Sequence, residues 1–231
     1  QMCIRDRTTP LLHDLLVILV NCAAYVPARV AIARSGGVEI ASKNLDRSED
    51  VLDAALGLLQ SLSLLKEPQH DIMRCSFMEQ LPSYLGGAMA ERVRVKALCV
   101  LQHLTATPEH ATLLLRHNVT ILLCQELASE PNPASCRYRA LACLLNLSGL
   151  SPESNHFTEY TMLRVLGWLR GHEQFAQLVD HILHNVSTVP DQLRILQHHG
   201  ITPKSANIRL IGDGSKAKGV NRHHHINMPA G

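Results

Sequence analysis

One polar residue interrupts an apolar helical run five times along this chain, at nearly constant spacing. These marker residues follow one another after 40, 42, 43 and 39 positions, and they are Asn21, Ser61, His103, Asn146 and Asn185. A period of about 40 residues is typical of helical solenoids, in which each unit buries its apolar face only against its neighbours. The spacing therefore predicts a single elongated helical array.

A proline follows each marker residue after five to seven positions. Proline ends one helix and suits the first turn of the next, where its missing N–H group is not needed. Each unit is therefore expected to contain a short first helix, a second helix and a long third helix that carries the marker. We predict first helices at 28–34, 71–74, 109–116, 153–160 and 192–197. Second helices are predicted at 38–45, 78–85, 119–128 and 162–169, and the first of the third helices at 10–24.

Glycine or asparagine separates the first helix from the second in several units. Gly36-Gly37, Asn118 and Gly200 stand where a left-handed residue would end the first helix. Together with Leu144-Leu145-Asn146-Leu147-Ser148, this pattern resembles the armadillo repeat. The HEAT repeat has a similar length but two helices and no glycine step, and it is the alternative.

The resemblance implies an all-α fold, a right-handed α-solenoid of about four to five armadillo-type three-helix repeats. We expect the repeat array at 8–202, and a basic, disordered tail at 203–231. Residues 1–7 are interpreted as an artefactual or disordered leader. Because neither end of the array resembles a polar cap, the chain is interpreted as part of a longer array.

Charge and composition disfavour several classes of function. The stretch 8–203 holds 15 Lys/Arg and 18 Asp/Glu, whereas nucleic-acid binding needs a strongly basic surface. No apolar run is long enough for a transmembrane helix, and no secretory signal is present. The seven scattered cysteines are interpreted as buried free thiols of a reducing compartment, so we expect a cytoplasmic protein, with nuclear or ciliary placement as alternatives.

The resemblance also implies where a partner would bind. In armadillo proteins the third helices line a concave groove, and marker asparagines hold the backbone of an extended ligand, since an amide both donates and accepts. The alternative is that such asparagines satisfy backbone groups within the stack. Nuclear-import adaptors carry tryptophan four residues before the asparagine. Here those positions hold Val17, Gly57, Cys99, Ala142 and His181, which disfavours a receptor for nuclear-localisation signals. Of these residues, His181 is predicted to line the groove.

Helical spacing places three basic residues on the predicted groove face, namely Arg92, Lys96 and Arg139. They would steer an acidic partner segment, unless they only form a solvated helix surface. The pair His181-x-x-His184 lacks a third metal ligand nearby in the sequence, and no cofactor or catalytic motif is recognised.

We therefore expect a non-catalytic scaffold that binds an extended segment of a partner protein in the groove. No small-molecule substrate, nucleic acid or membrane is expected as a partner. The armadillo portion of a co-chaperone, holding a client in the same groove, is the alternative function.

Overall fold

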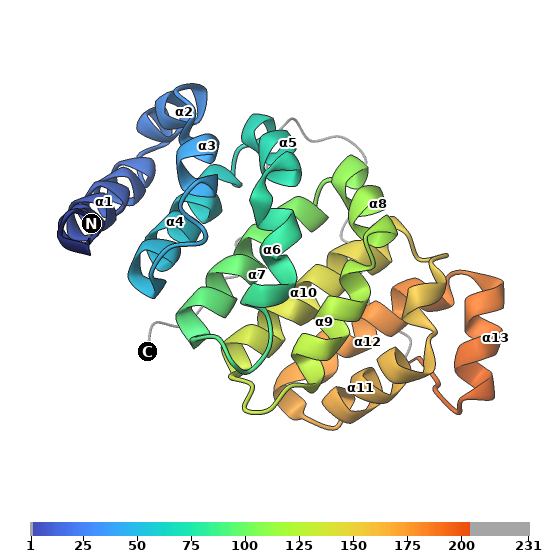
Figure 1. The fold of residues 1–231 in the computed structure, drawn as a ribbon. Coiled ribbons are helices and arrows are strands. Elements are labelled where there is room, and N and C mark those ends of the chain that lie inside the picture. The colour runs from blue at the N-terminus through green and yellow to red at the C-terminus, as the bar shows by residue number, and fades with distance from the viewer. Residues whose placement is uncertain (1, 204–231) are drawn as a thin grey trace, which may run out of the picture.

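The computed structural model describes residues 2–203, and its regular elements there are all helices (Figure 1). The long third helices are α1 (Met2–Ala23), α4 (Glu49–Leu62), α7 (Glu91–Thr105), α10 (Ala134–Leu150) and α12 (Glu173–Ser187). The second helices are α3 (Gly37–Ser42), α6 (Ser76–Tyr84), α9 (Val119–Ala128) and α11 (Tyr160–Arg170). The first helices are α2 (Val26–Arg34), α5 (Lys66–Arg74), α8 (Pro108–Arg116) and α13 (Pro190–His198). The predicted order of three helices per unit is confirmed for α2 to α10.

The third helices form a continuous row through the molecule, with the first and second helices beside them (Figure 1). Each third helix packs against the next one, from α1 against α4 to α10 against α12. Each of α4, α7, α10 and α12 also packs against the second helix that precedes it. This arrangement is the one-dimensional stacking that the period predicts.

The fourth unit departs from the prediction. The helix expected at 153–160 is absent, and a single 3-10 turn, η1 (Asn155–Phe157), takes its place. The segment Ser151–Asn155 is rich in serine and asparagine, whose side chains compete for backbone hydrogen bonds and so disfavour helix. Just after this segment, the Thr158 hydroxyl donates to the carbonyl of Asn155 at 3.1 Å.

The two ends of the described chain can be compared with the predicted bounds of the repeat array, 8–202. Helix α1 begins at Met2, well before the predicted start at residue 10, and it includes Pro10. The interpretation of residues 1–7 as a leader is untested by this observation and stays a prediction. The predicted disordered tail lies outside the described residues from residue 204 onward.

The steps between first and second helices have the expected left-handed backbone. Gly36 has φ 83°, Asn118 has φ 55° and Gly200 has φ 68°. Gly37, by contrast, is required because α2 and α3 pack too closely at this point to admit a side chain, and not because of its backbone angle. A Cβ built on Gly37 would lie 2.8 Å from the backbone oxygen of Ile32 and 3.1 Å from Leu62.

Gly37→Ala is expected to lower the free energy of unfolding by about 2 kcal/mol, because α2 and α3 must move apart to admit the methyl group. Gly167→Ala is the matched control, since a Cβ there meets nothing within 4 Å. That control should be neutral or stabilising by about 0.5 kcal/mol. Urea denaturation followed by circular dichroism measures both, and equal stability of the two variants would contradict the close approach.

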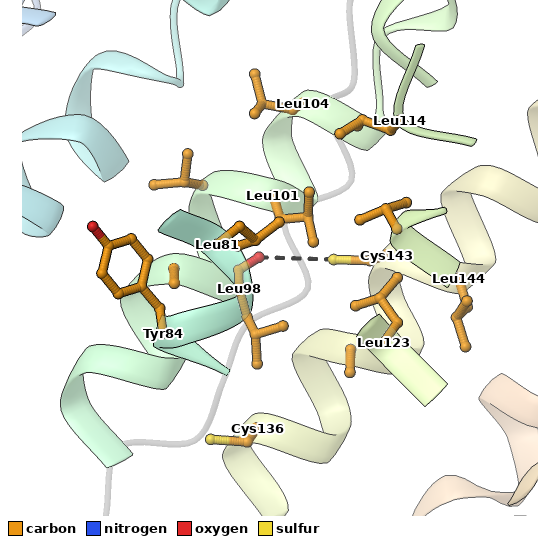
Figure 2. Packing of buried hydrophobic residues seen from close by; sticks show 14 of the residues in the cluster. Leu81, Tyr84, Leu98, Leu101, Leu104, Leu114, Leu123, Cys136, Cys143 and Leu144 are labelled. Carbon is orange, nitrogen blue, oxygen red and sulfur yellow. Dashed lines mark hydrogen bonds between the residues drawn. The ribbon is translucent and has the colours of Figure 1, made fainter. Parts of the chain in front are cut away.

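The core between repeats is aliphatic and contains buried thiols. Figure 2 shows Leu98 and Leu101 of α7 in one cluster with Leu123 of α9 and Cys143 of α10. The Cys143 thiol donates to the carbonyl of Leu98 at 3.7 Å. Burial raises the pKa of Cys143 and raises that of Cys136 to about 11, so both thiols are neutral core groups. The prediction of buried free thiols is confirmed for Cys99, Cys124, Cys136 and Cys143, whereas Cys75 is half-buried and Cys22 is exposed.

Candidate protein-binding groove

Two marker residues form the same hydrogen bond to the preceding third helix. Asn146 Nδ2 donates to Thr105 Oγ1 at 3.2 Å, and Asn185 Nδ2 donates to Ser148 Oγ at 3.1 Å. Each accepting hydroxyl stands two residues after the marker of its own helix and donates to a carbonyl three residues earlier. The marker row therefore links neighbouring repeats through a repeated amide-to-hydroxyl contact.

His103 forms the equivalent contact with a ring nitrogen. Its Nδ1 lies 2.7 Å from Ser63 Oγ, and that hydroxyl donates to the carbonyl of Gln60 at 2.8 Å. Since the serine proton is thus engaged, we assign the contact as Nδ1–H donating to the hydroxyl, as the amides do. The pKa of His103 is lowered to about 4, first by burial and then by the charges of Arg139 and Arg29. The ring is therefore neutral near pH 7, and Nε2 is a hydrogen-bond acceptor.

The first two marker residues do not take part in this row. Ser61 donates to the carbonyl of Gly57 in its own helix at 3.1 Å, and Asn21 is exposed. Ser61 has no hydroxyl to donate to in the preceding third helix, because the residue two positions after Asn21 is Ala23. The lateral row thus covers the last three markers.

The contacts of Asn146 show the alternative role of the marker amides, which is to satisfy polar groups within the stack. The two Nδ2 hydrogens of Asn146 are used within the stack, on Thr105 and on the carbonyl of Gln102 at 3.1 Å. Within residues 2–203, the Oδ1 atom of Asn146 has no hydrogen-bond partner. The donors therefore stabilise the array, and the binding of a ligand by the acceptor stays a prediction.

The three basic residues predicted for the groove differ in whether a carboxylate pairs with them. Arg92 Nη2 lies 2.8 Å from Glu49 Oε1 and 3.1 Å from Asp50 Oδ1. Lys96 Nζ lies 2.8 Å from Asp53 Oδ2. The acidic residues of α4 therefore neutralise both. Arg139 instead donates to the neutral amide oxygen of Gln102 at 2.9 Å, and no carboxylate pairs with it in the described chain.

His181, the remaining predicted groove residue, is half-buried on α12. Among the described residues, no group of three or more His, Cys, Asp or Glu side chains is placed to hold a metal ion. No helix among those residues is both long and apolar enough to span a membrane.

A buried ion pair between two repeats was missed by the sequence analysis. Arg94 of α7 and Glu126 of α9 are 2% and 0% exposed, with 2.6 Å between Nη2 and Oε1. The guanidinium also donates to Ser129 Oγ, Asn132 Oδ1 and the carbonyl of Pro131. The Gly86 N–H donates to Glu126 Oε2 at 2.6 Å, so both carboxylate oxygens are bound. This network fixes the link that leads into α10.

Comparison with known proteins identifies the architecture. No family model and no curated protein matches the chain. An engineered protein solved by the Northeast Structural Genomics Consortium superposes with a TM-score of 0.71 at 18% identity, over 81% of this chain and 78% of the other. A designed armadillo repeat protein superposes with a TM-score of 0.70 at 19% identity, over 81% of each chain. The chain has the armadillo-repeat fold.

A third neighbour is a computationally designed armadillo repeat protein for modular peptide recognition, with a TM-score of 0.69 at 16% identity over 83% of each chain. These armadillo structures and the three helices of each unit from α2 to α10 exclude the HEAT alternative for the fold. At these identities the likeness concerns the fold alone.

Proposed function

We propose that this armadillo array is a non-catalytic scaffold that binds an extended segment of a partner protein along its row of third helices. The observation that carries the proposal is the row of marker residues, in which nitrogen atoms bind the neighbouring repeat while acceptor atoms stay available. Asn146 Oδ1 and His103 Nε2 would accept N–H groups of an extended backbone. Peptide recognition by a designed neighbour of the same fold supports this reading.

The charges of the groove suggest which segment fits. Arg139 is the predicted basic groove residue that pairs with no carboxylate within the described chain. It lies near His103, and its positive charge helps to lower the pKa of that ring. A carboxylate of the partner placed opposite Arg139 would form a charge-assisted hydrogen bond. We therefore expect an extended segment with an acidic residue over the third repeat. The six described cysteines are free, which favours a reducing compartment such as the cytoplasm.

The test uses extended peptides selected from a randomised library on the wild-type chain. Arg139→Gln should weaken an acidic selected peptide by about tenfold, or about 1.4 kcal/mol, as measured by fluorescence anisotropy. The same peptide with Glu replaced by Gln should bind both proteins equally.

Arg164→Gln is the matched control, because Arg164 is an exposed arginine on α11 that lies over the ring of Tyr160. The proposal fails if this control loses as much affinity as Arg139→Gln. It also fails if the selected peptides do not distinguish Arg139→Gln from wild type.

A further inference from the structure

Lys96 of α7 reaches back to the preceding third helix and is held there by Asp53 of α4. Its ammonium lies 2.8 Å from Asp53 Oδ2 and donates to the Asp53 carbonyl at 3.0 Å. The ammonium lies over Gly57, where a Cβ atom would come within 3.6 Å of Lys96 Nζ. The side chains of Lys96 and Asp53 are only 28% and 24% exposed. Lys96 is thus fixed against α4 by a carboxylate that neutralises its charge.

Arg139 occupies the equivalent position one repeat later, but α7 does not provide an equivalent carboxylate. Lys96 and Arg139 each stand seven residues before the marker of their own helix, and Asp53 stands eight residues before the marker of α4. In α7 the position equivalent to Asp53 is Val95, which is half-buried and uncharged. One difference between α4 and α7 therefore accounts for why Lys96 is paired and Arg139 is not.

The surroundings of Arg139 agree with this equivalence. Burial raises the pKa of the Cys99 thiol, and the positive charge of Arg139 opposes that rise, so the guanidinium lies near Cys99. Cys99 stands four residues before its marker, as Gly57 does in α4. Arg139 thus lies over α7 as Lys96 lies over α4. Its hydrogen-bond partner there is the neutral amide oxygen of Gln102, 2.9 Å away.

The charges around Lys96 also disfavour an acidic ligand at this point of the groove. The cluster consists of Arg92 and Lys96 of α7 and of Glu49, Asp50 and Asp53 of α4. Three carboxylates face two cations, so the cluster has a net charge of −1, and Asp50 exposes 76% of its side chain. A partner carboxylate placed here would meet like charge, which is one way in which a site rejects a ligand.

We propose that Asp53 determines which acidic segments the groove accepts, because it masks Lys96 and leaves Arg139 as the basic residue that contacts the ligand. The inference rests on the proposed binding of an extended segment along the third helices. The preferred segment has a carboxylate opposite Arg139 and a residue without negative charge opposite Lys96. Neighbouring helices pack about 8–10 Å apart and an extended chain rises about 3.3 Å per residue, so these two ligand residues are about three positions apart.

The first test moves the carboxylate of Asp53 to the equivalent position of α7. The new carboxylate of Val95→Asp should pair with Arg139 and weaken an acidic peptide selected on the wild-type chain by about tenfold, the loss expected for Arg139→Gln. The double variant Val95→Asp/Arg139→Gln should lose no more than either single variant. Val95→Asn, which is polar without charge, is the matched control and should bind the peptide as wild type does. Wild-type affinity in Val95→Asp, or an equal loss in Val95→Asn, would overturn the proposal.

The second test leaves Val95 unchanged and unmasks Lys96 with Asp53→Asn. The ammonium then has a neutral amide beside it, as Arg139 has in Gln102. A second glutamate is placed at each other position of the selected peptide in turn, and affinities are measured by fluorescence anisotropy. In at least one position the second glutamate should make the peptide bind Asp53→Asn about fivefold more tightly than wild type. The singly acidic peptide should bind both proteins equally.

Asp191→Asn is the matched control for the second test, because it removes an exposed carboxylate of α13 that pairs with Arg194. This variant should not favour the doubly acidic peptide. If the selected peptides lose no affinity with Arg139→Gln, the groove function itself is wrong. If they do lose affinity, but no second glutamate favours Asp53→Asn, the role of Asp53 alone is wrong.

Discussion

Glu126→Ala is expected to lower the free energy of unfolding by about 3–5 kcal/mol, the largest effect of any single substitution considered for this chain. The reason is the fate of Arg94, which is 2% exposed and would lose its only carboxylate partner within the described residues. Burying an unpaired guanidinium costs far more than the ion pair itself contributes. Urea denaturation followed by circular dichroism measures the change.

The matched control is Glu130→Ala. Glu130 also pairs with an arginine, Arg137, but its side chain is 69% exposed. Exposed pairs contribute about 0–1 kcal/mol, so this variant should stay close to wild type. The double substitution Arg94→Met/Glu126→Leu removes both charges and should recover most of the stability that Glu126→Ala loses. If Glu126→Ala and Glu130→Ala lose equal stability, the buried network does not fix the link to α10.

The helices and their order could be predicted from the sequence because their signals are local and repeated. Apolar periodicity marks the third helices, and proline, glycine and asparagine mark the breaks between units. The fourth unit shows the limit of this approach. Pro152 occupies the expected place, but the serine and asparagine residues after it favour turns, and a 3-10 turn forms.

The partners of the polar side chains could not be predicted in the same way, because they lie 32 to 43 residues away in a neighbouring repeat. Arg92 and Lys96 were predicted either to steer an acidic partner segment or to form a solvated helix surface, and the carboxylates of α4 that pair with both could not be foreseen. One signal for the buried pair was present. Arg94 occupies a position that is leucine in α1 and α4 when the third helices are aligned by their marker residues. The same position holds Arg137 in α10, whose partner Glu130 is exposed, so a charge in this column of a repeat alignment indicates an ion pair but not its burial.

His103 predicts a dependence of stability on pH. Its pKa is about 4 in the folded chain, below the ordinary value of 6.5 that it regains on unfolding. Between these two values the unfolded chain binds a proton that the folded chain does not, so acid favours unfolding. The stabilisation from the neutral ring is therefore present above pH 6.5 and is lost as the pH falls towards 4. The shift corresponds to about 3 kcal/mol.

His103→Asn isolates this contribution, because asparagine can donate to Ser63 as Asn146 donates to Thr105. Carboxylates titrate in the same pH range in both proteins, so the comparison uses the difference between them. Between about pH 7.5 and pH 4.5, wild type should lose about 2–3 kcal/mol more stability than the variant. His117→Asn, at an exposed position, should follow wild type. Parallel stability curves for wild type and His103→Asn would show that the ring is protonated in the folded array, contrary to its assigned role as a neutral acceptor.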